Sequence, residues 1–220
     1  MQPTSNSLLL NIDGPIATIT INRPSSLNSL GMDGYKDLAS FIVHLNTLPE
    51  IVFIVITGTG KYFSSGADVK AAREVPPEMD KNLYYRERFD YGNGYVTRVF
   101  ADNTKILVFA LNGPAVGLSA ALTGHADMIY MADNAFIMTP FASIGLVAEG
   151  AASATYLQKM GLTLATEALV FDTKLTPELL LARGYINKIL PPGEAFLETV
   201  KQDLLAKLEG KNRTSILEIH

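Results

Sequence analysis

Apolar and polar positions along the chain change between strand-like and helical spacing. Ser7–Ile12 and Ile16–Asn22 flank the turn Asp13-Gly14-Pro15, which predicts an antiparallel hairpin. Asp33–Thr47 repeats apolar residues at helical spacing, which predicts a helix. Ile51–Thr57 is a continuous run rich in β-branched residues, as expected of a strand covered on both faces. The chain therefore begins in the order strand, strand, helix, strand.

The remainder of the chain alternates helical and strand-like segments. Helices are expected over Leu83–Asn103 (interrupted at Gly92-Asn93-Gly94), Gly117–Thr123, Ala151–Met160, Leu164–Phe171, Pro177–Arg183 and Glu194–Leu208. Strands are expected over Lys105–Leu111, Asp127–Met131, Phe136–Met138 and Asn187–Leu190. Arg73–Asn82 carries two prolines and mixed charge, which predicts a mobile surface segment. This order indicates an α/β fold, and 220 residues suit one domain with at most a small appendage.

One apolar stretch tests a membrane interpretation. Ile106–Gly124 carries no formal charge over a length that could cross a bilayer. Asn112-Gly113-Pro114 lies in its middle, which predicts a strand, a tight turn and a helix of small residues. We therefore expect buried core and no membrane span. A hydrophobic content of 48% with 18% charged residues is typical of a globular domain.

Composition excludes several kinds of chemistry. The net charge of −4 gives no basic surface for nucleic acid. The chain has no cysteine, which excludes disulfides, thiolate catalysis and zinc–thiolate sites. Its three histidines are scattered without metal-ligand spacing, so no metal is expected.

A single carboxylate stands in an otherwise uncharged segment. Pro140–Tyr156 is apolar or small almost throughout, and Glu149 is its one charged residue. One interpretation is a glutamate at the head of a helix, where the helix dipole favours a negative charge. The other is a general base or acid, because a poorly hydrated carboxylate tends towards a raised pKa. Both interpretations remain open from the residues alone.

Two glycine-rich loops follow buried strands, and each is expected to open a helix. The first is Ser64–Lys70, after Ile51–Thr57, and the second is Asn112–Ser119, after Ile106–Leu111. A helix start offers unpaired N–H groups, and glycine lets a ligand approach the backbone closely. Two such donors aimed at one point would form an oxyanion hole for a carbonyl oxygen. The alternatives are a phosphate cradle, whose usual motifs are absent, and ordinary turns.

These motifs together resemble the crotonase (enoyl-CoA hydratase/isomerase) superfamily. The resemblance rests on Asn22-Arg23-Pro24, Leu27–Leu30, SSGADVK from Ser64 and NGPAVGLSAAL from Asn112, in this order, and runs from about Leu8 to about Leu190. It implies an α/β fold with a spiral core of ββα units over residues 1–190 and a C-terminal helical region over residues 191–220. The chain ends earlier than family members usually do, so a truncated C-terminal region is one interpretation.

The resemblance also implies the site. The substrate is an acyl-CoA thioester, with no separate cofactor because CoA is part of the substrate. The thioester oxygen would accept hydrogen bonds from the backbone N–H groups of Ala67 and Leu118. The other residues expected to bind substrate are Ser65, Gly66, Asp68, Val69, Gly117 and Phe141.

Departures from the family pattern point to the reaction. Hydratases of this family use two glutamates, and the corresponding positions here are Ala121 and Phe141, so water addition is not expected. Glu149 is placed similarly to the single catalytic glutamate of fungal Δ3,Δ2-enoyl-CoA isomerases. In those enzymes an asparagine contacts the glutamate, and the matching position is Asn93. The residues alone would equally allow Gly92-Asn93-Gly94 to be a simple helix break.

The resemblance therefore predicts an isomerase in unsaturated fatty acid β-oxidation, with Glu149 moving a proton from C2 to C4 of a 3-enoyl-CoA. Phe141, Ile144 and Leu146 are expected to keep water out. Two other classes stay open. One is a different crotonase-type enzyme, either a thioester hydrolase or a dienoyl-CoA isomerase. A dienoyl-CoA isomerase would want a second acidic residue, for which the sequence shows no candidate. The other is a non-catalytic acyl-CoA binder.

Partners and compartment follow from the resemblance alone. Family members are normally trimers or pairs of trimers, so a homotrimer or hexamer is expected if the C-terminal region is complete. Fungal relatives are typically peroxisomal. The chain ends Leu217-Glu218-Ile219-His220, which is not an import tripeptide, so a cytoplasmic location is the alternative expectation.

Overall fold

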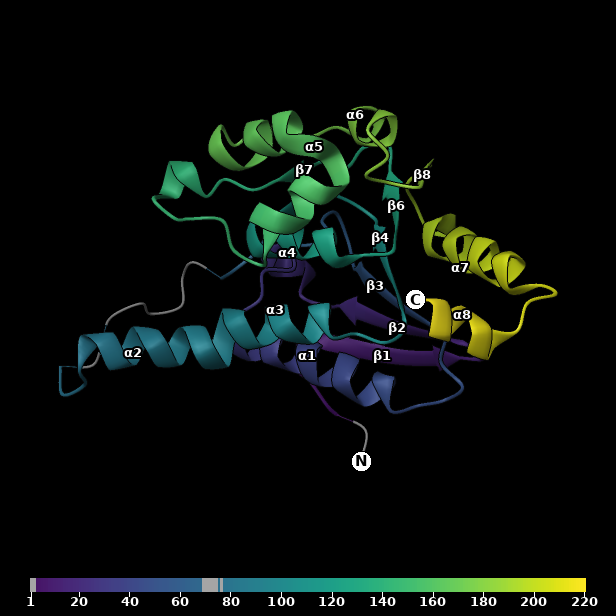
Figure 1. The fold of residues 1–220 in the computed structure, drawn as a ribbon, viewed down its shortest axis with the longest axis horizontal. Helices are drawn as coiled ribbons and strands as arrows, with labels where there is room; N and C mark the ends of the chain where they lie inside the picture. Colours follow the sequence, from purple (N-terminus) through teal and green to yellow (C-terminus); the bar gives the residue numbers. More distant parts are fainter. Residues whose placement is uncertain (1–2, 69–74, 76) are drawn as a thin grey trace.

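A single large β-sheet carries the helices that surround the site (Figure 1). The computed structural model describes residues 3–68, 75 and 77–220. The main sheet has the strand order β1-β2-β3-β4-β6-β8, and a second sheet pairs β5 with β7. The main-sheet strands are β1 (Leu8–Asp13), β2 (Ile16–Ile21), β3 (Phe53–Gly58), β4 (Ile106–Leu111), β6 (Met128–Ala132) and β8 (Lys188–Leu190); the others are β5 (Ala115–Val116) and β7 (Ile137–Met138).

The predicted hairpin and the buried strand are confirmed. β1 and β2 pair antiparallel, whereas β2, β3, β4, β6 and β8 pair parallel to one another. β3 lies between β2 and β4, and five of its six residues are buried. A strand enclosed in this way needs apolar side chains on both faces, which explains its continuous β-branched run.

The first predicted helix is α1 (Met32–Asn46). Its buried residues recur at helical spacing, so one face packs onto the strands while Lys36, Ser40 and Val43 face solvent. In Figure 1, α1 and α3 lie together beside β1 and β2, and α5 lies near β7 in the upper part of the view. The buried face of α1 is formed by Gly34, Tyr35, Leu38, Ala39, Phe41, Ile42 and Leu45.

The predicted interruption at Gly92-Asn93-Gly94 is also confirmed. α2 (Lys81–Arg88) leads through a π-helical turn, η2 (Phe89–Asn93), into α3 (Gly94–Ala101). Gly92 has non-helical φ and ψ of −115° and −109°. A Cβ built on Gly92 would lie 2.7 Å from the Met32 sulfur, so α1 passes where a side chain would stand. Arg73, Glu74 and Pro76 of the predicted mobile segment Arg73–Asn82 lie outside the described residues, and its last two residues begin α2.

The segment tested for a membrane span is buried core, as expected. It forms β4, the turn, β5 and α4 (Gly117–Leu122), which continues into the short turn η3 (Thr123–His125). Over the part of the chain that the structure describes, each helix is too short or too polar to cross a bilayer.

The C-terminal half holds two elements that were not predicted. The two helices expected after Glu149 are present as the two parts of α5 (Ala152–Val170), which are separated at Gly161 by non-helical φ and ψ of +78° and +162°. The short strand β5 and the last helix α8 (Arg213–Ile219) were not predicted. The remaining elements are η1 (Pro24–Ser26), η4 (Ala142–Ile144), α6 (Pro177–Ala182) and α7 (Ala195–Leu208). α7 buries Phe196, Val200 and Leu204 in the same core as the sheet, and the division at residue 190 stays a prediction.

Candidate active site

A cavity of about 840 Å³ opens beside the first turns of α1. Its wall combines segments that are far apart in the sequence: α1, the loop after β3, the turn between α2 and α3, and the segment before α5. Its lining includes Tyr35, Ala67, Asp68, Asn93, Leu146 and Glu149. The sequence-predicted base, its predicted helper and one predicted donor therefore share one cavity.

Glu149 is half-buried and hydrogen-bonded. The side-chain amide of Asn93 donates to its Oε1 at 3.0 Å. Asn93 follows the non-helical Gly92 and is the capping residue of α3, and both Asn93 and Glu149 line the cavity. The resemblance-based pairing of Asn93 with Glu149 is thus present in the geometry.

Glu149 is not a helix-start residue. α5 begins at Ala152 with Ala151 as its capping residue, and Glu149 lies in irregular chain ahead of both. Its backbone carbonyl accepts the N–H of Ala152 at 3.0 Å, and the residue lines the cavity. Glu149 therefore precedes the helix and stands at the cavity wall.

The two glycine loops meet each other. Gly66 has φ of +89°, and a Cβ built there would lie 2.6 Å from the Val116 carbonyl oxygen. The same atom would lie 3.4 Å from the Cα of Gly117, whose φ is +62°. The N–H of Val116 donates to the Ser64 carbonyl at 2.9 Å. Only glycine combines this backbone conformation with this close approach, so the two loops pack directly.

Ala67 follows Gly66, but it lies in a β-bridge where the sequence predicted a helix start. Leu30 donates to the Gly66 carbonyl (3.0 Å) and accepts from the Asp68 N–H (2.9 Å). In a parallel bridge of this kind the N–H of the central residue, here Ala67, points away from the partner strand. Val69 lies outside the described residues, as does any helix that starts there.

Leu118 follows Gly117 in the first turn of α4, where N–H groups have no partner within the helix. A Cβ built on Gly150 would lie 3.2 Å from Cδ1 of Leu118 and 3.2 Å from Cβ of Ala121. The residue after Glu149 thus packs against the residue expected to supply the second donor. Glu149, Ala67 and Leu118 are brought into one neighbourhood, and the oxyanion hole itself stays a prediction.

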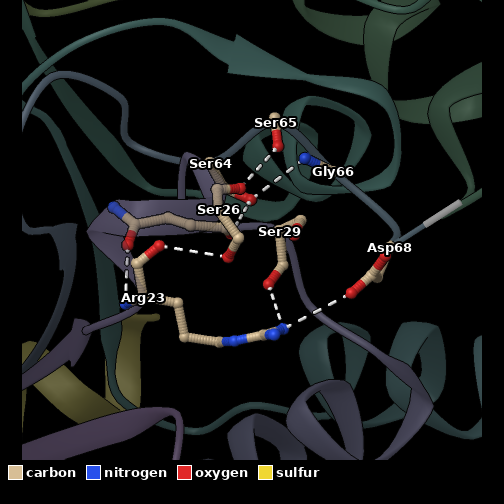
Figure 2. Close-up of polar contacts among 8 residues, drawn as sticks. Arg23, Ser26, Ser29, Ser64, Ser65, Gly66 and Asp68 are labelled. Atoms are coloured by element: carbon tan, nitrogen blue, oxygen red, sulfur yellow. Dashed lines mark hydrogen bonds and ion pairs between the residues drawn. The ribbon is translucent and has the colours of Figure 1, made fainter. Parts of the chain in front are cut away.

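The first loop is also held by a polar clamp that sequence reasoning did not assign (Figure 2). The Arg23 guanidinium donates to the Ser29 carbonyl at 2.7 Å and lies 3.8 Å from the Asp68 carboxylate. Ser65 donates its backbone N–H to the Leu27 carbonyl at 2.9 Å, and the Gly66 N–H donates to Ser64 Oγ at 3.1 Å. The sequence motif Asn22-Arg23-Pro24 could have indicated these contacts, but it served only as evidence of the family resemblance.

The two positions where hydratases carry glutamates are apolar and buried. Ala121 and Phe141 expose 0% and 2% of their surface. Phe141 is not among the residues that line the cavity, whereas Leu146 is. Ile144, expected to exclude water, exposes 56% of its surface within this chain. Of the three expected water-excluding side chains, only Leu146 borders the cavity.

His125 contacts the backbone beside Glu149. Its Nε2 lies 3.0 Å from the Gly150 carbonyl, a distance that fits an N–H donor on the neutral ring. Burial lowers the pKa of His125, the hydrogen bond to the Gly150 carbonyl opposes this shift in part, and the charge of Lys159 adds a smaller lowering. Among the residues that the structure describes, there is no group of three or more acidic, histidine or cysteine side chains placed to hold a metal ion.

Comparisons with known proteins agree with this architecture. The chain is 39% identical over 184 residues to the Δ(3,5)-Δ(2,4)-dienoyl-CoA isomerase of Pyricularia oryzae, covering 80% of this chain and 66% of the relative. It is 33% identical over 210 residues to the 3,2-trans-enoyl-CoA isomerase of Saccharomyces cerevisiae, covering 90% and 75%. This chain thus spans just under two thirds of the first relative.

A solved enoyl-CoA hydratase/isomerase from Mycobacterium paratuberculosis superposes with a TM-score of 0.85 at 28% identity, covering 98% of this chain and 83% of that one. The family model described as enoyl-CoA hydratase/isomerase matches residues 11–219. The chain therefore belongs to the enoyl-CoA hydratase/isomerase family.

Proposed function

We propose that this protein is an enoyl-CoA isomerase, and that it moves the double bond of a 3-enoyl-CoA to the trans-2 position with Glu149 as its one proton carrier. Relatives of 33–39% identity named as isomerases support the isomerase class. The observation that carries the finer proposal is the Asn93–Glu149 hydrogen bond on the cavity wall, combined with apolar residues at both hydratase positions.

The first chemical step requires that the C2–H bond of the substrate become more acidic. The N–H groups of Ala67 and Leu118 would hydrogen-bond to the thioester oxygen and stabilise the negative charge that develops there. The Glu149 carboxylate takes one C2 proton, and the electron pair of that C–H bond spreads over the oxygen, C2 and C4 as a dienolate. The Asn93 amide can follow the carboxyl group through this change, because an amide donor hydrogen-bonds to both its charged and its neutral form.

The second step returns the same proton. The neutral Glu149 carboxyl gives it to C4, the C3–C4 double bond becomes single, and a C2–C3 double bond forms. No proton is consumed, so one carboxyl group is enough. Hydration would need a second group to activate water, and Ala121 and Phe141 cannot supply one.

A second candidate is favoured by one specific observation: the Pyricularia oryzae relative is named as a dienoyl-CoA isomerase. Conversion of a 3,5-dienoyl to a 2,4-dienoyl thioester needs protonation at C6, farther from C2 than C4 is. A second acidic residue would serve that step. Asp33 and Asp68 line the same cavity as Glu149, so the chain offers two carboxyl groups for this role.

The test is a comparison of three substrates. trans-3-Hexenoyl-CoA, 3,5-octadienoyl-CoA and crotonyl-CoA are incubated separately with the protein, and ultraviolet absorbance follows conjugation or its loss. We expect conjugation of the 3-enoyl substrate and no appreciable hydration of crotonyl-CoA. Faster turnover of the dienoyl substrate would replace the proposal by the second candidate. Tight binding of all three without turnover would identify an acyl-CoA binder.

Assembly, cofactor and compartment belong to the same proposal. We expect a homotrimer or hexamer that needs no cofactor beyond the CoA of its substrate, in peroxisomes. Light scattering of the purified protein measures its oligomeric state. Activity after dialysis against a chelator tests whether a metal cofactor is needed. Imaging against a peroxisomal marker tests the compartment. Monomeric active protein or a cytoplasmic signal would replace the corresponding expectation.

A further inference from the structure

Three buried hydroxyl groups connect the cavity wall to both glycine loops. The Tyr35 hydroxyl lies 2.9 Å from Ser119 Oγ, and Ser119 Oγ lies 2.8 Å from Ser64 Oγ. Tyr35, Ser119 and Ser64 expose 2%, 4% and 0% of their surface. They come from α1, α4 and the loop after β3, so only the tertiary fold brings them together.

The direction of this chain of hydrogen bonds follows from counting protons. Each hydroxyl has one proton to donate. Ser64 donates its proton to the Asn28 carbonyl at 2.8 Å, so it can only accept from Ser119. Ser119 has then used its proton and can only accept from Tyr35. The O–H groups therefore point one way, from Tyr35 through Ser119 and Ser64 to the backbone of Asn28.

Both ends of the expected oxyanion hole are attached to these hydroxyls. Ser64 Oγ accepts the N–H of Gly66, the residue before Ala67. Ser119 follows Leu118 in the first turns of α4. Burial raises the pKa of the Tyr35 phenol, and the nearby charge of Glu149 contributes a smaller part of that shift, so Tyr35 stays a neutral donor. Tyr35 is among the residues that line the cavity with Glu149.

We propose that Tyr35, Ser119 and Ser64 are positioning residues: their one-way hydroxyl chain fixes the separation and aim of the Ala67 and Leu118 N–H groups. The catalytic part of this inference rests on the proposed enolate chemistry, whereas the direction of the chain rests on the hydrogen bonds alone. Donors held in this way need no reorganisation when charge develops on the thioester oxygen.

The direction predicts an unusual order among variants. Tyr35→Phe removes only the first donor and leaves every remaining hydroxyl with an acceptor. Ser119→Ala leaves the Tyr35 O–H buried without its acceptor, which is costly for a buried polar group. The double variant Tyr35→Phe/Ser119→Ala removes that stranded donor. It should therefore unfold at a higher temperature than Ser119→Ala alone, although it lacks more hydrogen bonds.

The experiment measures the thermal unfolding temperature, and kcat and KM with trans-3-hexenoyl-CoA, for the wild type, these three variants and Ser119→Thr. We expect Ser119→Ala to lower kcat about tenfold to a hundredfold with KM within about twofold, because misplacement of about 1 Å costs on that order. Tyr35→Phe should lower kcat less than Ser119→Ala does. Ser119→Thr keeps the hydroxyl and should restore most of kcat.

The outcomes separate the two claims. A double variant less stable than Ser119→Ala would overturn the one-way chain. A Ser119→Ala protein that is folded at the assay temperature and keeps wild-type kcat would overturn the positioning role. Absence of wild-type turnover would instead overturn the proposed function, and the order of unfolding temperatures would still decide the hydroxyl chain.

Discussion

Two regions beside the cavity are built in different ways. The donor wall, formed by the loops Ser64–Asp68 and Asn112–Leu118, has six of its twelve residues buried and is held by hydrogen bonds from several elements, although Ala67 itself is exposed. The base wall, the segment Phe141–Glu149, exposes 56% of Ile144 and 82% of Val147 within this chain. Donors that must hold a developing charge gain from rigidity. A carboxyl group that carries a proton from C2 to C4 must reach two positions, so a less enclosed segment suits it.

A few discrete contacts hold the base wall. Asp172 accepts the N–H groups of Ala142 and Ser143 at 3.3 and 2.8 Å, so it fixes the start of the segment. Asn93 holds Glu149 itself, and Gly150 packs on Leu118 at its end. Substitutions in the base wall should therefore act locally, whereas those in the donor wall should disturb several groups together.

The largest effect is expected at the base. Glu149→Gln keeps the shape of the side chain and its contact with Asn93 but cannot take a proton. The kcat of isomerisation should fall about 10²–10⁴-fold or more, which is the usual contribution of a positioned general base, while the unfolding temperature changes little. Steady-state assays and thermal unfolding check this. Activity within about tenfold of wild type would remove Glu149 from the mechanism.

The donor wall is probed by Gly66→Ala. The new Cβ would meet the Val116 carbonyl at 2.6 Å and would require φ near +89°, so the loop must shift and move the Ala67 N–H. We expect a loss of about 10² in kcat, near the cost of one oxyanion donor, together with a lower unfolding temperature. Gly161→Ala is the matched control, because Gly161 has φ of +78° and nothing within 4 Å of its Cβ position. Equal activity losses in the two variants would contradict the special role of Gly66.

Asn93→Ala isolates the contact that orients the base. A hydrogen bond to a charged group is worth about 1.5–3 kcal/mol, so a loss of about tenfold or more in kcat is expected, with little change in global stability. The exposed Asn82 of α2, changed to alanine, serves as the control. If both variants keep wild-type kcat, the Asn93 side chain does not orient Glu149, and Gly92-Asn93-Gly94 serves only as a break between α2 and α3.

The smallest effect concerns pH and the backbone beside Glu149. The pKa of folded His125 is lowered mainly by burial, whereas the unfolded chain binds the proton near pH 6.5. The unfolded state then binds more protons just below that pH, so stability is complete above about pH 6.5 and falls as pH is lowered through the folded pKa. Unfolding temperatures from about pH 7.5 to about pH 5.5 measure this slope. His125→Gln should flatten it, and an unchanged slope would assign the dependence to other groups.

Much of the fold could be predicted because local pattern and tertiary environment agree. The alternation around Gly14, the helical spacing of Leu38, Ile42 and Leu45, and the break near Asn93 all reappear in the structure. Agreement failed where tertiary contacts decide. Ala67 pairs with Leu30, which no local signal at Ala67 announces. Ala115–Val116 forms the strand β5 only by pairing with Ile137–Met138 of β7, which no local pattern indicates.

The candidate site divides in the same way. The sequence by itself determined the unusual carboxylate, the two glycine loops and the absence of both hydratase glutamates, because residue identity alone fixes those chemical possibilities. Only the tertiary structure decided that Asn93 donates to Glu149, that Arg23 clamps Asp68, and that Tyr35, Ser119 and Ser64 form one chain of hydroxyls. A hydrogen bond needs a partner within about 3 Å, and residues distant along the chain reach that separation only after the sheet and its helices have packed.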